Sequence, residues 1–325
     1  MARYVLRRTG GALVSLIALM LTGFFLFRIL PGDPVTVLTR GRHLGPGQLA
    51  ELRHQFGLDK PLTRQFADYA LRVARGDLGT SFEYRIPVRQ LILQHLGATV
   101  YLAGTATVIS VALGLWLGTR SAWRPGSLSD RINSAVALTL WSVPQFWLGL
   151  MLIVVLAAGA GPIPGIFPTG GINTPGVTGF FPVLSDELRH LALPCLTYVA
   201  TIYAQILLIM RASLLDEKGS DYLTTARAKG LRDALVLRRH AVPNALLPVM
   251  TQVSLNLGAI ISSTAILVET VFSWPGLGTL FYQALSIPDQ PLLEGLFLFF
   301  SASVIVMNLA ADLLYPLLDP RVRTA

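Results

Sequence analysis

The sequence predicts an all-α integral membrane protein that crosses the bilayer six times. Its 325 residues are 53% hydrophobic and only 14% charged, whereas soluble domains average about 25% charged residues. A chain so poor in charge cannot cover its surface with polar groups in water, so membrane lipid is the solvent that fits it. Six apolar runs, each close to the roughly 20 residues that a helix needs to cross the hydrocarbon core, set the number of spans.

Each apolar run is interpreted as a helix, because a backbone in lipid must satisfy its hydrogen bonds within the segment. The expected spans cover about residues 9–30, 97–119, 132–160, 191–211, 244–268 and 295–314. The first run follows three arginines, as a signal peptide would. Its apolar core continues as far as Pro31, which favours a retained helix over a cleaved leader. Pro144 is expected to kink the third span.

Three connecting segments are long enough to carry structure or function. Residues 31–96 and the Gly/Pro-rich loop 161–190 are expected on the extracytoplasmic side, and residues 212–243 on the cytoplasmic side. Within the first segment, the spacing of apolar residues predicts one short helix around residues 49–56, and Pro61 can start another that ends near Arg75. This region is either a partly ordered loop or a platform for an external partner.

The distribution of basic residues predicts the orientation. Six spans place both termini on one side of the membrane. If that side is cytoplasmic, most of the 26 lysines and arginines lie there, and the two short outer loops contain only Arg189. Residues 31–96 are basic as well, but this segment exceeds the length over which the positive-inside rule is counted. The prediction is a multi-pass protein of the inner or plasma membrane with cytoplasmic termini.

Several classes of function are disfavoured by what the sequence lacks. Cys195 is the only cysteine, so neither an intramolecular disulfide nor a cysteine-rich metal site is expected, and the five histidines lack metal-ligand spacing. No nucleophile–base pair stands out, so no catalytic residue is predicted. The basic residues are spread among apolar runs, which argues against a nucleic-acid partner. None of the three lysines follows a glycine, so the phosphate loop of ATPases is missing.

The segment after the fourth run has the signals of a short helix. Ser220 is a suitable N-cap and Gly230 a suitable C-terminal stop, which predicts a helix of about nine residues. So short a helix is unstable alone and must pack on something. A second short helix is expected from Asp233, and Pro243 can open the next span. The loop is either an ordinary basic connector or a docking site for a soluble partner.

This loop resembles the conserved cytoplasmic loop of ABC importer permeases, the EAA loop. Gly230 and Pro243 stand at that loop's glycine and proline, and Ala226 at its second alanine. The sequence departs from the pattern at Thr224, which replaces the glutamate, and at Thr225, which replaces the first alanine. Motifs along nearly the whole chain are similar to the first permease subunit of dipeptide and oligopeptide importers. They lie at residues 30–34 (LPGDP), 57–61 (GLDKP), 76–81 (GDLGTS), 142–144 with Phe146, 225–230 (TARAKG) and 269–278 (ETVFSWPGLG).

The resemblance implies a type I ABC importer permease fold and a non-catalytic subunit of a transport complex. It implies a second, homologous permease subunit, two ATP-binding domains and an extracytoplasmic peptide-binding protein as partners. ATP and Mg would be bound by the ATPase partners, so no cofactor is expected in this chain. The residues expected to form the ATPase-docking site are Tyr222, Leu223, Ala226, Lys229, Gly230, Leu231 and Pro243.

Transport of a polar substrate by alternating access would require inward-facing polar groups in the spans. The candidates are Tyr203, Gln205, Gln252, Asn256 and Ser263, although interhelical hydrogen bonding is an equally good explanation of each. Glu269 is a candidate outer gate or a structural residue. A membrane scaffold that docks a soluble partner remains an alternative. Dipeptides, longer peptides, nickel chelates and glutathione remain alternative substrates.

Overall fold

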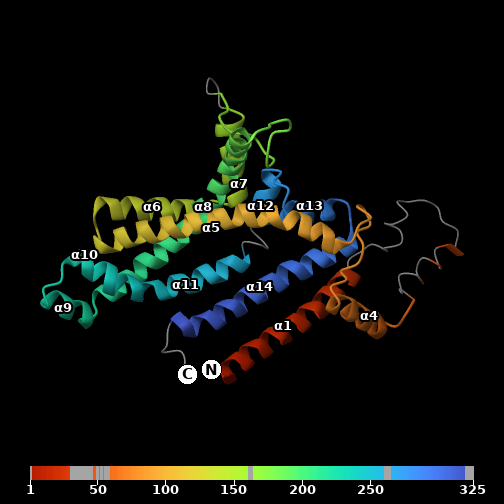
Figure 1. Cartoon of the computed structure of the whole chain (residues 1–325), viewed down its shortest axis with the longest axis horizontal. Coiled ribbons are helices and arrows are strands. Elements are labelled where there is room, and N and C mark those ends of the chain that lie inside the picture. Colours follow the sequence, from red (N-terminus) through yellow and green to blue (C-terminus); the bar gives the residue numbers. More distant parts are fainter. Residues whose placement is uncertain are drawn as a thin grey trace.

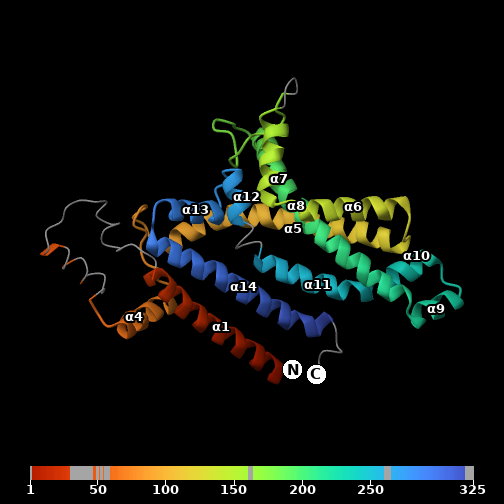
Figure 2. The ribbon, with the colours of Figure 1, turned by 180° about the vertical axis from the view of Figure 1, so that it is seen from behind.

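The computed structural model describes residues 2–29, 47–48, 51, 54, 59–159, 164–259 and 265–318, and the regular elements in these ranges are helices. Figures 1 and 2 show the long helices side by side in a layered bundle. The helices are α1 (Ala2–Ile29), α4 (Leu62–Ala74), α5 (Val88–Trp123), α6 (Leu128–Ser142), α7 (Gln145–Leu152), the π-helix η1 (Ile153–Ala157), α8 (Phe180–Lys218), α9 (Asp221–Ala228), α10 (Asp233–Val236), the π-helix η2 (Leu237–Ala241), α11 (Val242–Ala259), α12 (Ala265–Val271), α13 (Leu277–Ser286) and α14 (Gln290–Leu318).

Four helices in the described part of the chain are long and apolar enough to cross a membrane, and a bent pair makes a fifth. The four lie in α1, α5, α8 and α14. The bent pair is α6 with the segment Gln145–Ala157, whose axes differ by 101°. The kink expected at Pro144 is therefore a complete break of the third span. Val143 takes the extended conformation that a following proline imposes on its neighbour, so the helix cannot continue through it.

The other helices differ from the expected spans mainly at their ends. α5 begins at Val88 instead of residue 97, and α8 begins at Phe180, inside the segment 161–190 that was expected to be a loop. Counting consecutive apolar residues finds only the part of a helix that would lie in the hydrocarbon core. Both helices begin earlier in the sequence, directly after their N-cap residues Pro87 and Gly179. The expectation of a loop over residues 180–190 was wrong for this reason.

The fifth run and the outer segments contain further differences. The run expected at 244–268 is helical in its described parts, which belong to α11 and α12, and residues 260–264 lie outside the described residues. α13 was not expected. The short helix predicted from Pro61 is confirmed as α4. Most of the helix predicted around residues 49–56 lies outside the described residues.

The seam between α5 and α8 forms the centre of the bundle. One face of α5 carries a row of small buried side chains at i, i+4 spacing, and this row lies against α8. A Cβ atom on Gly114 would lie 2.7 Å from the Ile206 Cβ atom, and one on Gly118 would lie 2.7 Å from the Leu207 carbonyl oxygen. The two backbones thus approach as closely as small residues allow. The row consists of Ala106, Ser110, Gly114, Gly118 and Ala122, preceded by Leu102.

Two ion pairs tie other helices into the bundle. The Arg211 guanidinium of α8 donates from Nε to Asp130 Oδ1 at 2.6 Å and from Nη2 to Asp130 Oδ2 at 2.9 Å, which fastens the start of α6 to α8. The Gly126 amide also donates to this buried carboxylate, at 2.9 Å. Arg8 and Asp312 pair at 2.9 Å between α1 and α14. This second pair holds the start of α1 beside the last turns of α14.

A buried carboxylate anchors the GDLGTS motif at the opposite end of the bundle. Asp289, which is 1% exposed, accepts a hydrogen bond from the Ser81 hydroxyl at 2.5 Å and from the Glu83 amide at 3.0 Å. Tyr84 donates from its hydroxyl to Gln283 Oε1 at 3.0 Å. These bonds fasten the segment before α5 to α13 and to the turn between α13 and α14.

We expect Gly118→Ala to destabilise the protein, because the added methyl group would meet the Leu207 carbonyl oxygen, which cannot move without shifting α8. The cost of such overpacking is about 1–3 kcal/mol. Gly104→Ala is the matched control on the same helix, since a Cβ atom there meets nothing within 4 Å. Thermal unfolding in detergent should show a lower melting temperature for the first variant only. Equal melting temperatures would mean that the seam is not close-packed.

Candidate functional site

The predicted docking loop lies at one end of the helix layer. Figures 1 and 2 place α9 and α10 at the end of the bundle that is remote from α4 and α13. The chain enters the loop from α8 and leaves it through η2 into α11. This loop thus joins α8 and α11 directly, so a force applied to α9 acts on both of them.

α9 has one face turned toward its own chain and one turned outward. Leu223 and Ala226 are buried in the main hydrophobic cluster, together with Leu214, Val236 and Ala245. These two docking candidates therefore hold the helix in place and are not available to a partner. The exposed side chains that a partner could contact include Thr224, Thr225, Ala228 and Lys229.

Gly230 ends α9 in the way its position in the sequence predicts. Its φ is +80°, its amide donates to the Arg227 carbonyl at 2.9 Å, and the Leu231 amide donates to the Ala226 carbonyl at 3.4 Å. These two bonds form a Schellman motif, in which glycine is preferred because other residues are strained at positive φ. Leu231 then packs against the same hydrophobic cluster as Leu223. The turn redirects the chain toward α10.

Tyr222 links the start of α9 to both neighbouring helices. Its hydroxyl donates to the Glu217 carboxylate and accepts from Asn244 Nδ2 at 3.2 Å. Burial and the bond to Glu217 raise the pKa of Tyr222 to about 12, so the hydroxyl stays protonated at neutral pH. Ser220 is the N-cap residue of α9, as expected, but its hydroxyl makes no capping bond to the helix and lies 3.5 Å from the Glu217 carboxylate.

Pro243 is the second residue of α11, which follows the π-helix η2 without a break. Its side chain is exposed. The described docking candidates thus divide into those that shape the loop and those on its surface. Leu223, Ala226, Gly230 and Leu231 shape it, and Tyr222, Lys229 and Pro243 are exposed.

The pathway candidates do not form a single described cluster. Tyr203 is buried within the main hydrophobic cluster, and its carbonyl oxygen lies at the close approach to Gly114. Gln205 on α8 and Gln252 on α11 are half-buried, and both take part in polar interactions. The side chain of Asn256 and the whole of Ser263 lie outside the described residues.

Glu269 caps a helix that the sequence analysis missed. Its carboxylate accepts from the Gly278 amide at 2.7 Å and the Thr279 amide at 3.4 Å, which are in the first turn of α13. These bonds give partners to two first-turn amides that have none within the helix. A Cβ atom on Gly276 would lie 2.3 Å from Glu269 Oε2, which explains the glycine in the motif. The missed signal was the Pro-Gly pair followed by an apolar run.

The same motif is fastened to α5. Trp274 is fully buried, and its indole N–H donates to the Ala98 carbonyl at 2.9 Å. The Leu277 amide donates to the Thr99 hydroxyl oxygen at 2.8 Å. The ETVFSWPGLG segment is therefore a folded corner that fixes α12 and α13 against the N-terminal half of α5.

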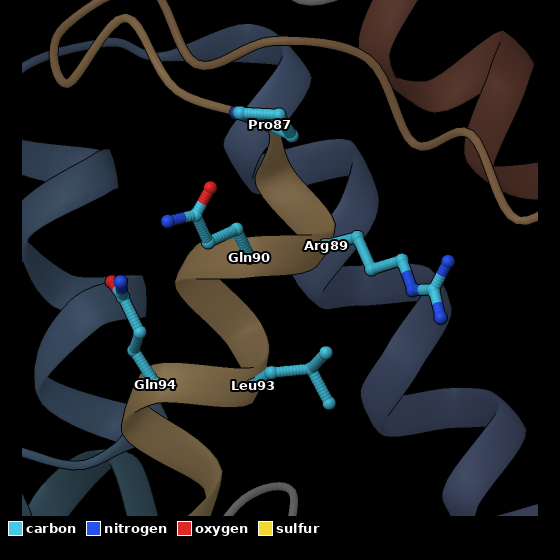
Figure 3. A pocket seen from close by; sticks show the side chains of 5 residues that line it. All are labelled: Pro87, Arg89, Gln90, Leu93 and Gln94. Carbon is cyan, nitrogen blue, oxygen red and sulfur yellow. The ribbon is translucent and has the colours of Figure 1, made fainter.

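A shallow hollow of about 370 Å³ lies at the start of α5. It is lined by Pro87, Arg89, Gln90, Leu93 and Gln94. Figure 3 shows the two glutamines projecting on one side of the helix and Arg89 with Leu93 on the other. This lining holds amides and one cation but no nucleophile. Among the described residues, no group of three His, Cys, Asp or Glu side chains is placed to hold a metal ion.

Comparison with known proteins gives matches over both halves of the chain. The family described as "Binding-protein-dependent transport system inner membrane component" matches residues 110–324, and its N-terminal companion family matches residues 1–103. Three similar proteins each align over 99% of this chain and 99% of their own length. They are the dipeptide transport system permease protein DppB of Escherichia coli (strain K12), 35% identical; the di/tripeptide transport system permease protein DppB of Pseudomonas aeruginosa (strain UCBPP-PA14), 37% identical; and the glutathione transport system permease protein GsiC of Pectobacterium atrosepticum, 35% identical.

These matches confirm the resemblance that the sequence motifs indicated. The helical bundle, with its several apolar helices, agrees with the type I ABC importer permease fold. The chain belongs to the family of inner membrane components of binding-protein-dependent transport systems, and it is a multi-pass membrane permease.

Proposed function

We propose that this chain is a permease subunit of an ATP-driven importer of dipeptides or oligopeptides. It would form half of the translocation pathway, and a second, homologous permease subunit would form the other half. Two ATP-binding domains would bind ATP and Mg and supply the energy, and an extracytoplasmic binding protein would deliver the peptide. The observation that carries this proposal is α9, a short helix held by Leu223 and Ala226 with its opposite face exposed.

The proposed mechanism is alternating access. Closure of the ATPase domains would move α9 as a rigid body, since Gly230 and the buried face of α9 fix it to its own chain. That motion would pass to α8 and α11, the helices on either side of the docking loop. The polar candidates Gln205 and Gln252 lie on these two helices and would meet the polar peptide. Tyr203, Asn256 and Ser263 complete the proposed pathway set.

The orientation proposed is that of a protein of the inner or plasma membrane with both termini in the cytoplasm. The Arg8–Asp312 pair supports it by keeping the ends of α1 and α14 together. The basic docking loop supports it because cytoplasmic loops carry an excess of Lys and Arg. Glu269 and the folded corner around it would then lie at the outer end, where we propose an outer gate.

Two substrate classes have support from relatives. The DppB proteins are named for dipeptides and tripeptides, and the GsiC protein for glutathione, at similar identity. Glutathione is itself a modified tripeptide, so one polar pathway can suit both. A nickel chelate is a third alternative substrate. A membrane scaffold that transports nothing is the alternative function.

The first prediction concerns partners and substrate. The chain, expressed with its neighbouring genes and purified in detergent, should carry an ATPase chain with it. Reconstituted vesicles with ATP inside and the binding protein outside should accumulate dialanine more than glutathione or a nickel–histidine chelate. Purification without any ATPase would support the scaffold, and preferential uptake of glutathione or nickel would replace the substrate assignment.

The second prediction concerns coupling through Gly230. Gly230→Val should reduce uptake while insertion stays intact, because a β-branched residue at φ +80° costs about 1–2 kcal/mol or more and shifts α9. A Cβ atom there meets nothing within 4 Å, so the effect would come from the backbone alone. Uptake and ATP hydrolysis in vesicles are the measurements.

The matched control is Gly219→Val in the same loop, where the glycine has an ordinary φ of −79°. This variant should transport nearly normally. Unchanged uptake by Gly230→Val would show that the Schellman turn is not needed for docking.

The third prediction concerns the accessibility of the pathway residue Gln252 and its dependence on the proposed gate residue Glu269. In a Cys195→Ala background, a cysteine replacing Gln252 should react with a membrane-impermeant thiol reagent applied outside, and the reaction should depend on the nucleotide state. Glu269→Ala should weaken this dependence, because it leaves the first-turn amides of α13 without their acceptor and loosens the corner. No labelling in any state would place residue 252 away from the pathway.

A further inference from the structure

Trp123, the last residue of α5, joins the docking loop to the bundle. Its indole N–H donates to Asp233 Oδ2 of α10 at 2.9 Å. Its carbonyl oxygen accepts from Lys218 Nζ, at the end of α8, at 2.9 Å. Trp123, Lys218 and Asp233 belong to α5, α8 and α10, respectively. Trp123 therefore connects three helices through its indole and its backbone carbonyl.

Two cations also lie over the Trp123 ring. Lys218 Nζ is 5.2 Å and Arg227 Cζ is 5.8 Å from the ring centroid. Both distances are within the range of about 6 Å in which a cation is attracted to the face of an indole. Arg227, on α9, also pairs with Asp233 through Nε and Oδ1 at 3.3 Å. The contacts therefore form a closed ring that includes the docking helix itself.

The helix that carries Trp123 is held rigidly just before it. Ala122 and Gly118 lie in the buried row that packs against α8, where a methyl group on Gly118 could not be accommodated. The Asp130–Arg211 pair adds the start of α6 to the same end of α8. A displacement of α9 is thus transmitted through Trp123 to a body made of the inner halves of α5, α6 and α8.

We propose that Trp123 is a positioning residue that couples the docking helix to α5, so that α9, α5, α6 and α8 move as one unit during the ATP-driven step. This inference rests on the proposed function. The proposed coupling adds a route that the covalent chain does not provide. The docking loop is joined in sequence to α8 and α11 but not to α5, so motion of α9 can reach α5 only through side-chain contacts. Without the Trp123 contacts, α9 would still pull on α8 and α11, but α5 would be reached only through its packing.

The test compares Trp123→Leu with Trp116→Leu in the complete complex, reconstituted with its co-purified partners. Trp116 is on the same helix and 59% exposed, so it controls for loss of an indole. The transported probe is dialanine or glutathione, whichever the wild-type complex takes up. The measured quantities are uptake per ATP hydrolysed, the amount of ATPase that co-purifies, and the melting temperature of the complex.

Trp123→Leu should lower uptake per ATP about fivefold, the loss expected when a hydrogen bond and its cation contacts disappear, with the amount of co-purified ATPase unchanged. The melting temperature should fall as well, because the same contacts stabilise the folded complex, so the ratio of uptake to hydrolysis decides the test. Trp123→Phe should give an intermediate value, because the ring remains for Lys218 and Arg227 while the N–H donor is lost. A merely structural tryptophan would lower the melting temperature and leave the ratio of uptake to hydrolysis unchanged.

Asp233→Ala tests the same link from the other side, and it also covers the case in which Trp123→Leu fails to assemble. It removes the acceptor of the indole and the partner of Arg227, and it should lower the same ratio. A normal ratio in an assembled Trp123→Leu complex, or in Asp233→Ala, overturns the inference. A wild-type chain that brings no ATPase, or takes up neither probe, instead contradicts the proposed function.

Discussion

The close approach of α5 and α8 is the constraint on which the rest of the structure depends. Lipid tails are as apolar as leucine, so two helices gain little from hydrophobic burial in a membrane and associate through tight packing. The small residues of α5 make that packing possible, because Gly114 and Gly118 let its backbone lie against the backbone of α8. The other elements are then fastened to this pair by a few polar contacts, such as Asp130–Arg211 and Trp274 to the Ala98 carbonyl.

The two ends of the bundle use buried polar groups differently. At the end near α13, the Glu269 and Asp289 carboxylates accept backbone amides and a hydroxyl, so each stabilises the start of a helix or a turn. At the end that holds α9 and α10, two cations lie over an aromatic ring, and the charged groups remain partly exposed. Backbone capping produces a fixed corner, whereas side-chain contacts near the surface can follow a moving partner. This difference agrees with a proposed gate at one end and a proposed drive at the other.

Sequence reasoning succeeded where a single local feature decides the structure. The Gly230 turn and α4 after Pro61 each follow from one residue whose backbone preference dominates its surroundings. Ser220 is likewise the N-cap residue of α9, although its hydroxyl lies 3.5 Å from the Glu217 carboxylate and makes no capping bond. Sequence reasoning failed where contacts from other parts of the chain decide the structure. Trp123 gave no signal, since its three partners, Lys218, Arg227 and Asp233, come from other parts of the chain.

The sequence by itself determined that this is a helical membrane protein, that it belongs with importer permeases, and which loop resembles a docking site. Those properties depend on composition, on apolar run length and on short motifs, all of which are local. Only the tertiary structure decided that Leu223 and Ala226 face inward, that Pro144 breaks a span by 101°, and that Glu269 caps α13. Such features arise from contacts between helices, and the direction in which a side chain points depends on which neighbour its helix meets.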